Sequence, residues 1–275
     1  MRWGLFGVRL GIIIINLIIA LIVILAVIPL GMDGLDVHVP EAGEMTWTLQ
    51  GNVLHLSAPI SVRNGGFYDL EDFSVALQVH DDTGDQVMND RTEPVNLVAG
   101  KTTDVNLQLN LDIGNLSQED KKKIVFEGTS FNVTANIETC YMMKLMKFGM
   151  TINNGMQWSP LINSFGVDQS EISHQLSGTQ IEIVVPYHIS PSNIVYGRVI
   201  GVSSELRNST SIFGTGSDSV TLRPNTTGEF HYLMSQEATI WLTTHSDTLT
   251  IVINLTFVGT TTQGTFQYYW NTLGP

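Results

Sequence analysis

The chain has 275 residues, with 13 Lys and Arg against 26 Asp and Glu and a formal net charge of −13 at pH 7. This acidic balance disfavours nucleic acid and anionic lipid surfaces as partners, because both repel a negatively charged protein. The single cysteine, Cys140, excludes an intramolecular disulfide, so we expect each domain to depend on a hydrophobic core.

A continuous apolar run from Leu10 to Leu30 has the length and hydrophobicity to cross a membrane. Its 21 residues include nine Ile, five Leu and two Val, so insertion is favourable despite Asn16. Arg2 and Arg9 precede the run and acidic residues follow it, which predicts a cytoplasmic N terminus and an exterior remainder. We therefore expect residues 1–32 to be an uncleaved signal anchor of a single-pass protein of the cell membrane.

Two other interpretations of this run stay open. The apolar region of a cleaved secretory signal usually has about 7–15 residues and ends at a small-residue site. This run is longer and has no Ala-x-Ala sequence at its end. A pilin-type leader would be processed near Arg9-Leu10-Gly11, and its apolar stretch would pack into a filament core. No acidic residue lies just past that point to neutralise a growing filament end, so we favour the anchor.

Period-two alternation of apolar and polar residues dominates the rest of the chain. The clearest runs are 54–62, 105–113 and 249–257. Each predicts a strand with one buried face and one solvated face. Turn residues separate such runs, as at Asn64-Gly65-Gly66 and Pro224-Asn225, and Gly214-Thr215-Gly216 is also explained as a turn. The best helix signal after the apolar run is 117–123, where Ser117 can cap a turn or two.

The exterior part repeats itself at a shift of 125 residues. Without gaps, this shift lays inward positions on inward positions and the 99–102 turn on the 224–227 turn. We therefore predict two immunoglobulin-like antiparallel β-sandwich domains, over 37–150 and 176–275, with a linker or junction at 151–175. The predicted fold class is all-β, preceded by the N-terminal transmembrane helix.

A methionine-rich segment lies around the predicted junction. Residues 142–171 look too irregular for a strand and too apolar for a free linker. Their Met and Trp side chains either fill the junction between the domains or form an adaptable surface for lipid tails or a protein partner, and we favour the first. The residues predicted for such a surface are Met146, Met150, Trp158 and Leu161.

Residues 58–73 resemble the opening of the late embryogenesis abundant (LEA) type 2 fold, also called the WHy domain. In that family a strand ends in a Val-x-Asn element, here Val62-Arg63-Asn64, and an irregular bend and a second strand follow. The turn Ala99-Gly100-Lys101-Thr102 and the alternating strand from Val105 to Leu111 are also similar to the family pattern. The resemblance covers residues 45–138.

The second half of the chain departs from this pattern, since the 125-residue shift places Ile189 opposite Asn64. For the whole chain the resemblance implies a tandem, membrane-anchored pair of seven-stranded antiparallel β-sandwiches without a catalytic centre. It also implies a link to desiccation and stress responses, with lipid or partner binding in an apolar groove.

Acidic side chains in one predicted hairpin are the sharpest candidates for a metal site. Asp81, Asp82 and Asp85 offer hard oxygen ligands of the kind that calcium prefers. Asp and Gly are also what a tight turn favours, and the ligand pattern of a calcium loop is incomplete here. Both interpretations stay open.

Five Asn-x-Ser/Thr sequons are candidates for glycosylation of an exterior domain. They begin at Asn115, Asn132, Asn208, Asn225 and Asn254. Asn132 and Asn254 fall on the polar side of their predicted strands, where a glycan has room.

The sequence contains no nucleophile-elbow, phosphate-loop or dinucleotide motif, and its histidines lack the pair spacing of a common zinc site. We expect a non-enzymatic, extracytoplasmic structural or binding protein of the cell envelope without a cofactor. It would contact the membrane through Leu10–Leu30 and bind lipid or other envelope proteins. The alternative is a pilin-like or adhesin subunit of a surface filament.

Overall fold

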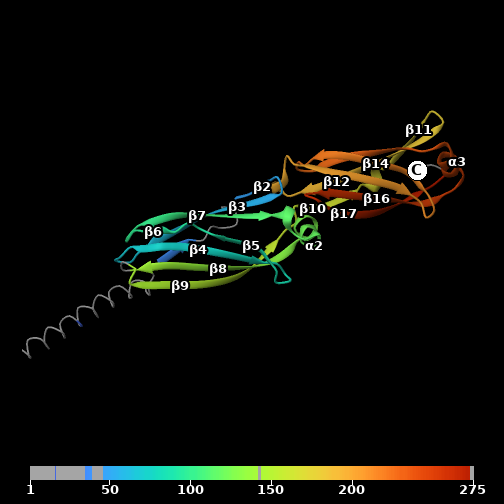
Figure 1. Cartoon of the computed structure of the whole chain (residues 1–275). Helices are drawn as coiled ribbons and strands as arrows, with labels where there is room; N and C mark the ends of the chain where they lie inside the picture. The colour runs from blue at the N-terminus through green and yellow to red at the C-terminus, as the bar shows by residue number, and fades with distance from the viewer. Residues whose placement is uncertain (1–15, 17–34, 39–45, 142–143, 273–275) are drawn as a thin grey trace, which may run out of the picture. The chain divides into compact units, whose positions relative to one another are not determined.

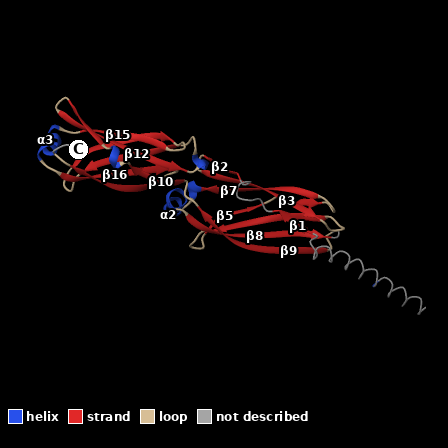
Figure 2. Cartoon of the chain, turned by 180° about the vertical axis from the view of Figure 1, so that it is seen from behind, coloured by secondary structure: helices blue, strands red, loops and turns tan. Residues whose placement is uncertain are grey.

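The computed structural model describes residues 16, 35–38, 46–141 and 144–272, and most of them lie in antiparallel strands (Figure 1). Figure 2 shows that strands make up most of the described chain and helices only a small part. The all-β prediction is confirmed at this level. The predicted anchor, Leu10–Leu30, lies outside the described residues except for Asn16. Within the described part of the chain, no helix has the length and apolar character needed to span a membrane.

The chain divides into two compact units, which we describe separately. Unit 1 contains the described residues of 1–47, 55–111 and 132–155. Unit 2 contains residues 48–54 and 112–131 and the described residues of 156–275. Five strands contribute residues to both units: β2 (Thr46–Gln50), β3 (Val53–Asn64), β7 (Thr102–Asp112), β8 (Thr129–Tyr141) and β9 (Met146–Trp158).

Unit 1 is built from two sheets. Its strands are β1 (Leu35–His38), β2 (Thr46–Gln50), β3 (Val53–Asn64), β4 (Leu70–His80), β5 (Gln86–Arg91), β6 (Val95–Leu97), β7 (Thr102–Asp112), β8 (Thr129–Tyr141) and β9 (Met146–Trp158). In one sheet β3 pairs with β1, β2 and β7, and in the other the order is β5-β4-β8-β9, with β6 also pairing with β4.

The core of unit 1 follows from the alternation in its strands. Along β7, buried Val105, Leu107 and Leu109 alternate with exposed polar residues, as period-two patterning requires. These side chains pack in one cluster with Phe73 and Leu97, which are fully buried. The predicted strand at 105–113 is therefore confirmed apart from its last residue.

Unit 2 has the same kind of two-sheet construction. Its strands are β10 (Ile162–Val167), β11 (Ser173–Ser177), β12 (Gln180–Pro191), β13 (Val199–Arg207), β14 (Ile212–Thr221), β15 (Thr226–Leu233), β16 (Asp247–Phe257) and β17 (Thr260–Trp270). Its helical segments are η1 (Ile113–Asn115), α2 (Gln118–Lys122), η2 (Lys123–Glu127), η3 (Gln169–Glu171), η4 (Asn193–Val195) and α3 (Gln236–Thr244). Here β12 pairs with β10, β11 and β15, and the second sheet has the order β14-β13-β16-β17.

The strand order of the first nine strands recurs in the last eight. The set around β3 matches the set around β12, and β5-β4-β8-β9 matches β14-β13-β16-β17. A side-chain contact recurs as well: the indole Nε1 of Trp158 donates to the Ile124 carbonyl (3.0 Å), and that of Trp270 donates to the Leu242 carbonyl (2.8 Å). Trp158 is the last residue of β9, and Trp270 is the last residue of β17. The acceptor Ile124 lies in η2, just before β8, and the acceptor Leu242 lies in α3, just before β16.

The segment that looked too irregular for a strand is mostly strand. β9 runs to Trp158 and β10 begins at Ile162, so strands cover much of residues 151–175, which were predicted as a linker or junction. Two glycines, Gly149 and Gly155, lower the intrinsic strand propensity of β9. Pairing with β8 overrides that propensity, because the neighbouring strand satisfies the backbone groups on the side of β9 that faces it.

Candidate functional site

The acidic hairpin between β4 and β5 is organised around Asp81. Its buried carboxylate accepts hydrogen bonds at Oδ1 from the Thr83 amide (2.9 Å), the Thr83 hydroxyl (2.7 Å) and the Asp85 amide (2.8 Å). Burial raises the pKa of Asp81, but these hydrogen bonds outweigh it and leave the pKa below its ordinary value. Asp81 thus acts as the internal cap of a tight turn.

The calcium candidates are not brought together. Asp82 and Asp85 are exposed on the turn, whereas Asp81 is buried beneath it. Within the ranges that the structure describes, no group of three His, Cys, Asp or Glu side chains is placed to hold a metal ion. The turn interpretation accounts for the position of Asp81, and the calcium interpretation has no ligand set to use.

Two of the four residues predicted for a lipid or partner surface lie in the interior of unit 2. Trp158 is 9 % exposed and its ring packs edge-on against Phe131, with the ring centroids 6.4 Å apart. Leu161 is fully buried, and its amide donates to the same Ile124 carbonyl that Trp158 uses. Both side chains lie where β9 leads into β10, and they pack inward because burial of apolar surface is favourable. The surface prediction is therefore wrong for these two residues.

The other two residues lie on β9, in unit 1. Met146 is half-buried against the core, and Met150 is 49 % exposed. On the same face of β9, Phe148 and Ile152 are also exposed. We call Phe148, Met150 and Ile152 the β9 strip. The alternation of apolar and polar residues from 146 to 153 is a signal from which sequence reasoning could have found Phe148 and Ile152.

The opposite face of β9 is polar and is tied to β8. Thr151 donates to Asn136 (2.8 Å), Thr134 donates to Asn153 (2.8 Å), and Lys147 donates to Glu138 (3.3 Å). The bond from Lys147 lowers the pKa of Glu138, and nearby Arg91 lowers it further. β9 is the last strand of its sheet in the described part of the chain, so its outer backbone edge is open to another strand.

The five sequons differ in accessibility. Asn115, Asn132 and Asn225 are exposed, and Asn254 is half-buried with its Oδ1 accepting from Gln263. Asn208 is only 9 % exposed, and its Oδ1 accepts from the amides of Thr210 and Ser211. Asn208 is thus engaged inside a turn, which disfavours a glycan at this sequon.

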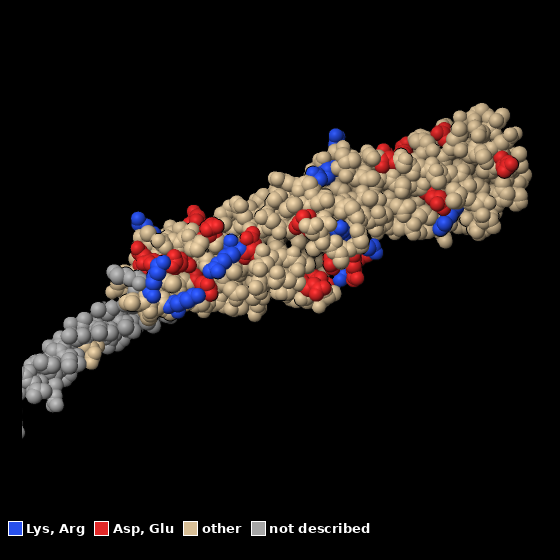
Figure 3. All heavy atoms as spheres, in the orientation of Figure 1, with Lys and Arg blue, Asp and Glu red and all other residues tan. Residues whose placement is uncertain are grey.

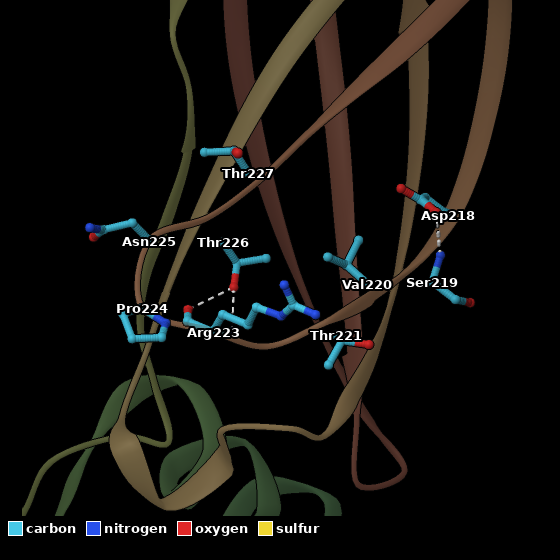
Figure 4. A pocket seen from close by; sticks show the side chains of 9 residues that line it. All are labelled: Asp218, Ser219, Val220, Thr221, Arg223, Pro224, Asn225, Thr226 and Thr227. Carbon is cyan, nitrogen blue, oxygen red and sulfur yellow. Dashed lines mark hydrogen bonds between the residues drawn. The ribbon is translucent and has the colours of Figure 1, made fainter.

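A shallow hollow of about 420 Å³ lies where β14 leads into β15, within unit 2 (Figure 4). Arg223 contributes a guanidinium to it, and Thr226 holds the turn by accepting from the Arg223 amide and donating to the Arg223 carbonyl, both at 2.8 Å. At its other side Asp218 accepts a hydrogen bond from Tyr187 (3.0 Å). Most of the lining is exposed, so water reaches its charged groups and weakens their interactions.

The bend after β3, which carries the family resemblance, is held by the buried amide of Asn64. Its Nδ2 donates to the carbonyls of Tyr68 (2.9 Å) and Leu97 (2.8 Å), and its Oδ1 accepts from the Gly66 amide (3.0 Å). The Asn64 backbone also bonds to the turn at 98–101. One side chain therefore joins the bend to the β6–β7 turn.

No family model matches this sequence, and no curated protein matches it. Among solved structures, a red sea bream transglutaminase is similar over 86 % of this chain and 31 % of its own, with a TM-score of 0.32 and 10 % identity. A glycosyl hydrolase family 2 member from Bacteroides cellulosilyticus is similar over 80 % and 29 %, with a TM-score of 0.32 and 12 % identity. A DUF4785 family protein from Legionella pneumophila is similar over 87 % and 57 %, with a TM-score of 0.29 and 13 % identity.

This chain spans less than two thirds of each of those three chains. Likenesses with such TM-scores carry no argument about fold or activity. The resemblance to the LEA type 2 family therefore stays a prediction.

Proposed function

We propose that this chain is a non-enzymatic, single-pass membrane protein of the cell envelope that presents two β-sandwich modules outside the cell for structural or binding purposes. The observation that carries the proposal is the apolar run Leu10–Leu30. Its length matches the hydrocarbon core of a bilayer, and its basic N-terminal flank favours a cytoplasmic N terminus. The repeated antiparallel strand order agrees with this role, since such sandwiches are common scaffolds of cell-surface domains.

The roles in stress and lipid binding rest on the family resemblance alone. The lipid or partner surface in this proposal lies on β9 and consists of Met146 and the β9 strip, which includes the predicted residue Met150. Native mass spectrometry of the protein after gentle extraction tests lipid binding. The anchor holds lipid in every variant, so we expect a Met150→Lys variant to carry fewer bound lipids than the wild type, and an equal number would remove the β9 strip from the proposal.

Membrane insertion is tested with the full chain carrying a tag at each end. We expect the protein to stay in the membrane after alkaline carbonate extraction, and protease added to intact cells to remove the C-terminal tag only. An Ile15→Arg/Ile22→Arg variant is expected to be released, because each central arginine costs about 2.5–3.5 kcal/mol of insertion free energy. Ile15→Ala/Ile22→Ala is the matched control. Wild-type protein in the soluble fraction would refute the proposal.

A second candidate is a subunit of a surface filament or other assembly, and β9 is the observation that favours it. A 13-residue edge strand with exposed apolar side chains and a single charge, Lys147, is a template for pairing with another chain. A mature N terminus at or near Gly11 would support this candidate, whereas an intact Met1 supports the anchor. Met150→Lys should abolish assembly if β9 forms the contact, because a charge on an edge strand opposes pairing.

A further inference from the structure

Three loops come together at one end of unit 1. The bend 65–69 follows Asn64, and the turn 98–101 is bonded to the same residue, since the Gly100 amide donates to the Asn64 carbonyl (2.7 Å). The third loop follows Tyr141, whose ring packs edge-on against Tyr68 with the centroids 5.7 Å apart. Backbone pairing of Leu70 with Tyr141 places the start of β4 beside the end of β8 at this end.

Each of these loops exposes a large apolar side chain. Phe67 is 69 % exposed, Val98 is 42 % exposed and Leu145 is 78 % exposed. We call these three residues the tip cluster. Exposed large apolar side chains gathered in one place mark contact surfaces more often than scattered ones do.

The loops that carry the tip cluster are held in place by hydrogen bonds. The Ala99 amide donates to Asp69 (2.8 Å), which fixes the turn that bears Val98. Lys144 pairs with Asp72 at 2.6 Å, which fixes the residue next to Leu145, and this bond raises the pKa of Lys144. These two acidic side chains are therefore engaged by partners within the loops.

The chain enters unit 1 at this same end. β1 begins at Leu35, which pairs with Asn64 in the antiparallel ladder. Four residues, 31–34, separate Leu35 from Leu30. Even a fully extended chain covers at most roughly 18 Å over that interval. Leu35, which pairs with Asn64 at this end of unit 1, therefore lies within that distance of the end of the apolar run.

We propose that the tip cluster inserts into the outer interface of the same bilayer that Leu10–Leu30 crosses, so that unit 1 is docked on the membrane surface. This inference rests on the proposed function. The anchor already holds the cluster at the surface, so even a weak apolar contact is occupied at the high effective concentration that a short tether creates. Aromatic and aliphatic side chains at the headgroup level bury their apolar parts among acyl chains.

The charge around the cluster is compatible with a zwitterionic surface. Arg63 and Lys101 are exposed beside the loops, and Lys144 lies next to Leu145. On the face seen in Figure 3, basic and acidic side chains are interspersed over unit 1, without a large field of one sign. The contact should therefore depend on apolar burial and change little with salt, unlike attachment by a polybasic patch.

The test uses the full chain in phosphatidylcholine nanodiscs, with Cys140→Ser as the background. Phe67→Cys, Val98→Cys and Leu145→Cys each receive an environment-sensitive NBD label. Two controls receive the same label: Leu176→Cys, an apolar residue of unit 2 that is 76 % exposed, and Gln86→Cys, at the opposite end of unit 1. We expect blue-shifted emission and quenching by nitroxide lipids at the three tip positions, and water-like emission at both controls.

Failure of the inference is distinguishable from failure of the anchor. If the protein stays in the discs and the tip labels behave like Leu176→Cys, the docking proposal is overturned and the anchor stands. If the protein leaves the discs, both proposals fall. The substitutions replace exposed side chains and should leave the fold intact, which circular dichroism of each labelled variant checks. Unchanged quenching in high salt supports an apolar contact, and its loss would indicate electrostatic attachment instead.

Discussion

The sharpest prediction concerns Asn64, the residue that joins the bend after β3 to the β6–β7 turn. Asn64→Ala removes three hydrogen bonds, two of them buried and one part-buried, and leaves the carbonyls of Tyr68 and Leu97 and the amide of Gly66 without that partner. A hydrogen bond contributes about 1 kcal/mol net, and an orphaned buried group costs about 1–3 kcal/mol. We therefore expect unit 1 to lose about 3 kcal/mol or somewhat more.

The assay has to resolve the units, because a chain with two units need not unfold in one step. Hydrogen exchange measured by mass spectrometry on peptides from β4 and β8 reports the opening free energy of unit 1. Asn106→Ala is the matched control, since Asn106 is exposed and accepts one hydrogen bond, from Ser57. We expect a change below about 0.5 kcal/mol for this surface residue.

Equal protection in the Asn64 and Asn106 variants would refute the reasoning. It would mean that the backbone bonds of the bend hold it without the side chain. A loss confined to peptides of the bend, with β4 and β8 unchanged, would show that the bend opens locally and does not brace the sandwich.

Four further predictions follow from the geometry. Burial raises the pKa of Tyr232 to about 12. The neutral phenol therefore contributes about 3 kcal/mol to the free energy of unfolding, fully below pH 10, and this contribution should be lost as the pH rises towards 12. Tyr232→Phe should flatten that part of a curve of stability against pH. The lowered pKa of Asp81 has the opposite sign: its contribution is present above the ordinary value of 3.8 and is lost as the pH falls below it, so Asp81→Asn should weaken the acid dependence of unfolding. Trp158→Phe and Trp270→Phe should each lower the free energy of unfolding by about 1–2 kcal/mol, and hydrogen exchange should rise in η2 for the first variant and in α3 for the second. A rise in only one of the two helical segments would contradict the equivalence of the two tryptophans. Glycopeptide mapping of native protein should find Asn208 unmodified, and a glycan there would disprove its burial.

The clearest strands could be predicted because apolar and polar residues alternate along most of their length. Runs 54–62 and 249–257 lie within β3 and β16, and Ser117 caps α2 by accepting from the Asp120 amide (3.1 Å). These are local signals, in which a residue's neighbours along the chain decide its structure.

Helix α3 could not be found in the same way. It contains several β-branched residues, among them Thr239 and Ile240, which lower helix propensity. The Ser235 cap on the Ala238 amide and the indole bond from Trp270 to the Leu242 carbonyl stabilise it, and the second of these comes from a distant strand. Tertiary contact therefore decides where local propensity is weak.

The prediction of a turn at Gly214-Thr215-Gly216 is wrong for a related reason. These residues lie within β14, and the two glycines face aromatic rings. A Cβ on Gly214 would lie 2.9 Å from the Tyr232 ring, and one on Gly216 would lie 2.7 Å from the Phe230 ring. The glycines make room for large side chains across the sandwich, which only the pairing of the two sheets reveals.

The candidate sites were less predictable than the strands because a site depends on which surfaces stay uncovered. The last strands of the two repeated sheets, β9 and β17, show this. On β17, Phe266 packs against Phe165 with the centroids 6.2 Å apart, and Trp270 packs against His174 at 4.8 Å. The three residues of the β9 strip, in contrast, are each between 37 % and 49 % exposed. Exposed apolar side chains on an edge strand favour association and lower solubility, so stability alone gives no reason to keep them. β17 does expose Tyr269 at 65 %, but on the opposite side from Trp270. On the side that carries Phe266 and Trp270, β17 is covered where β9 is open, and this difference favours β9 as the surface for a binding partner.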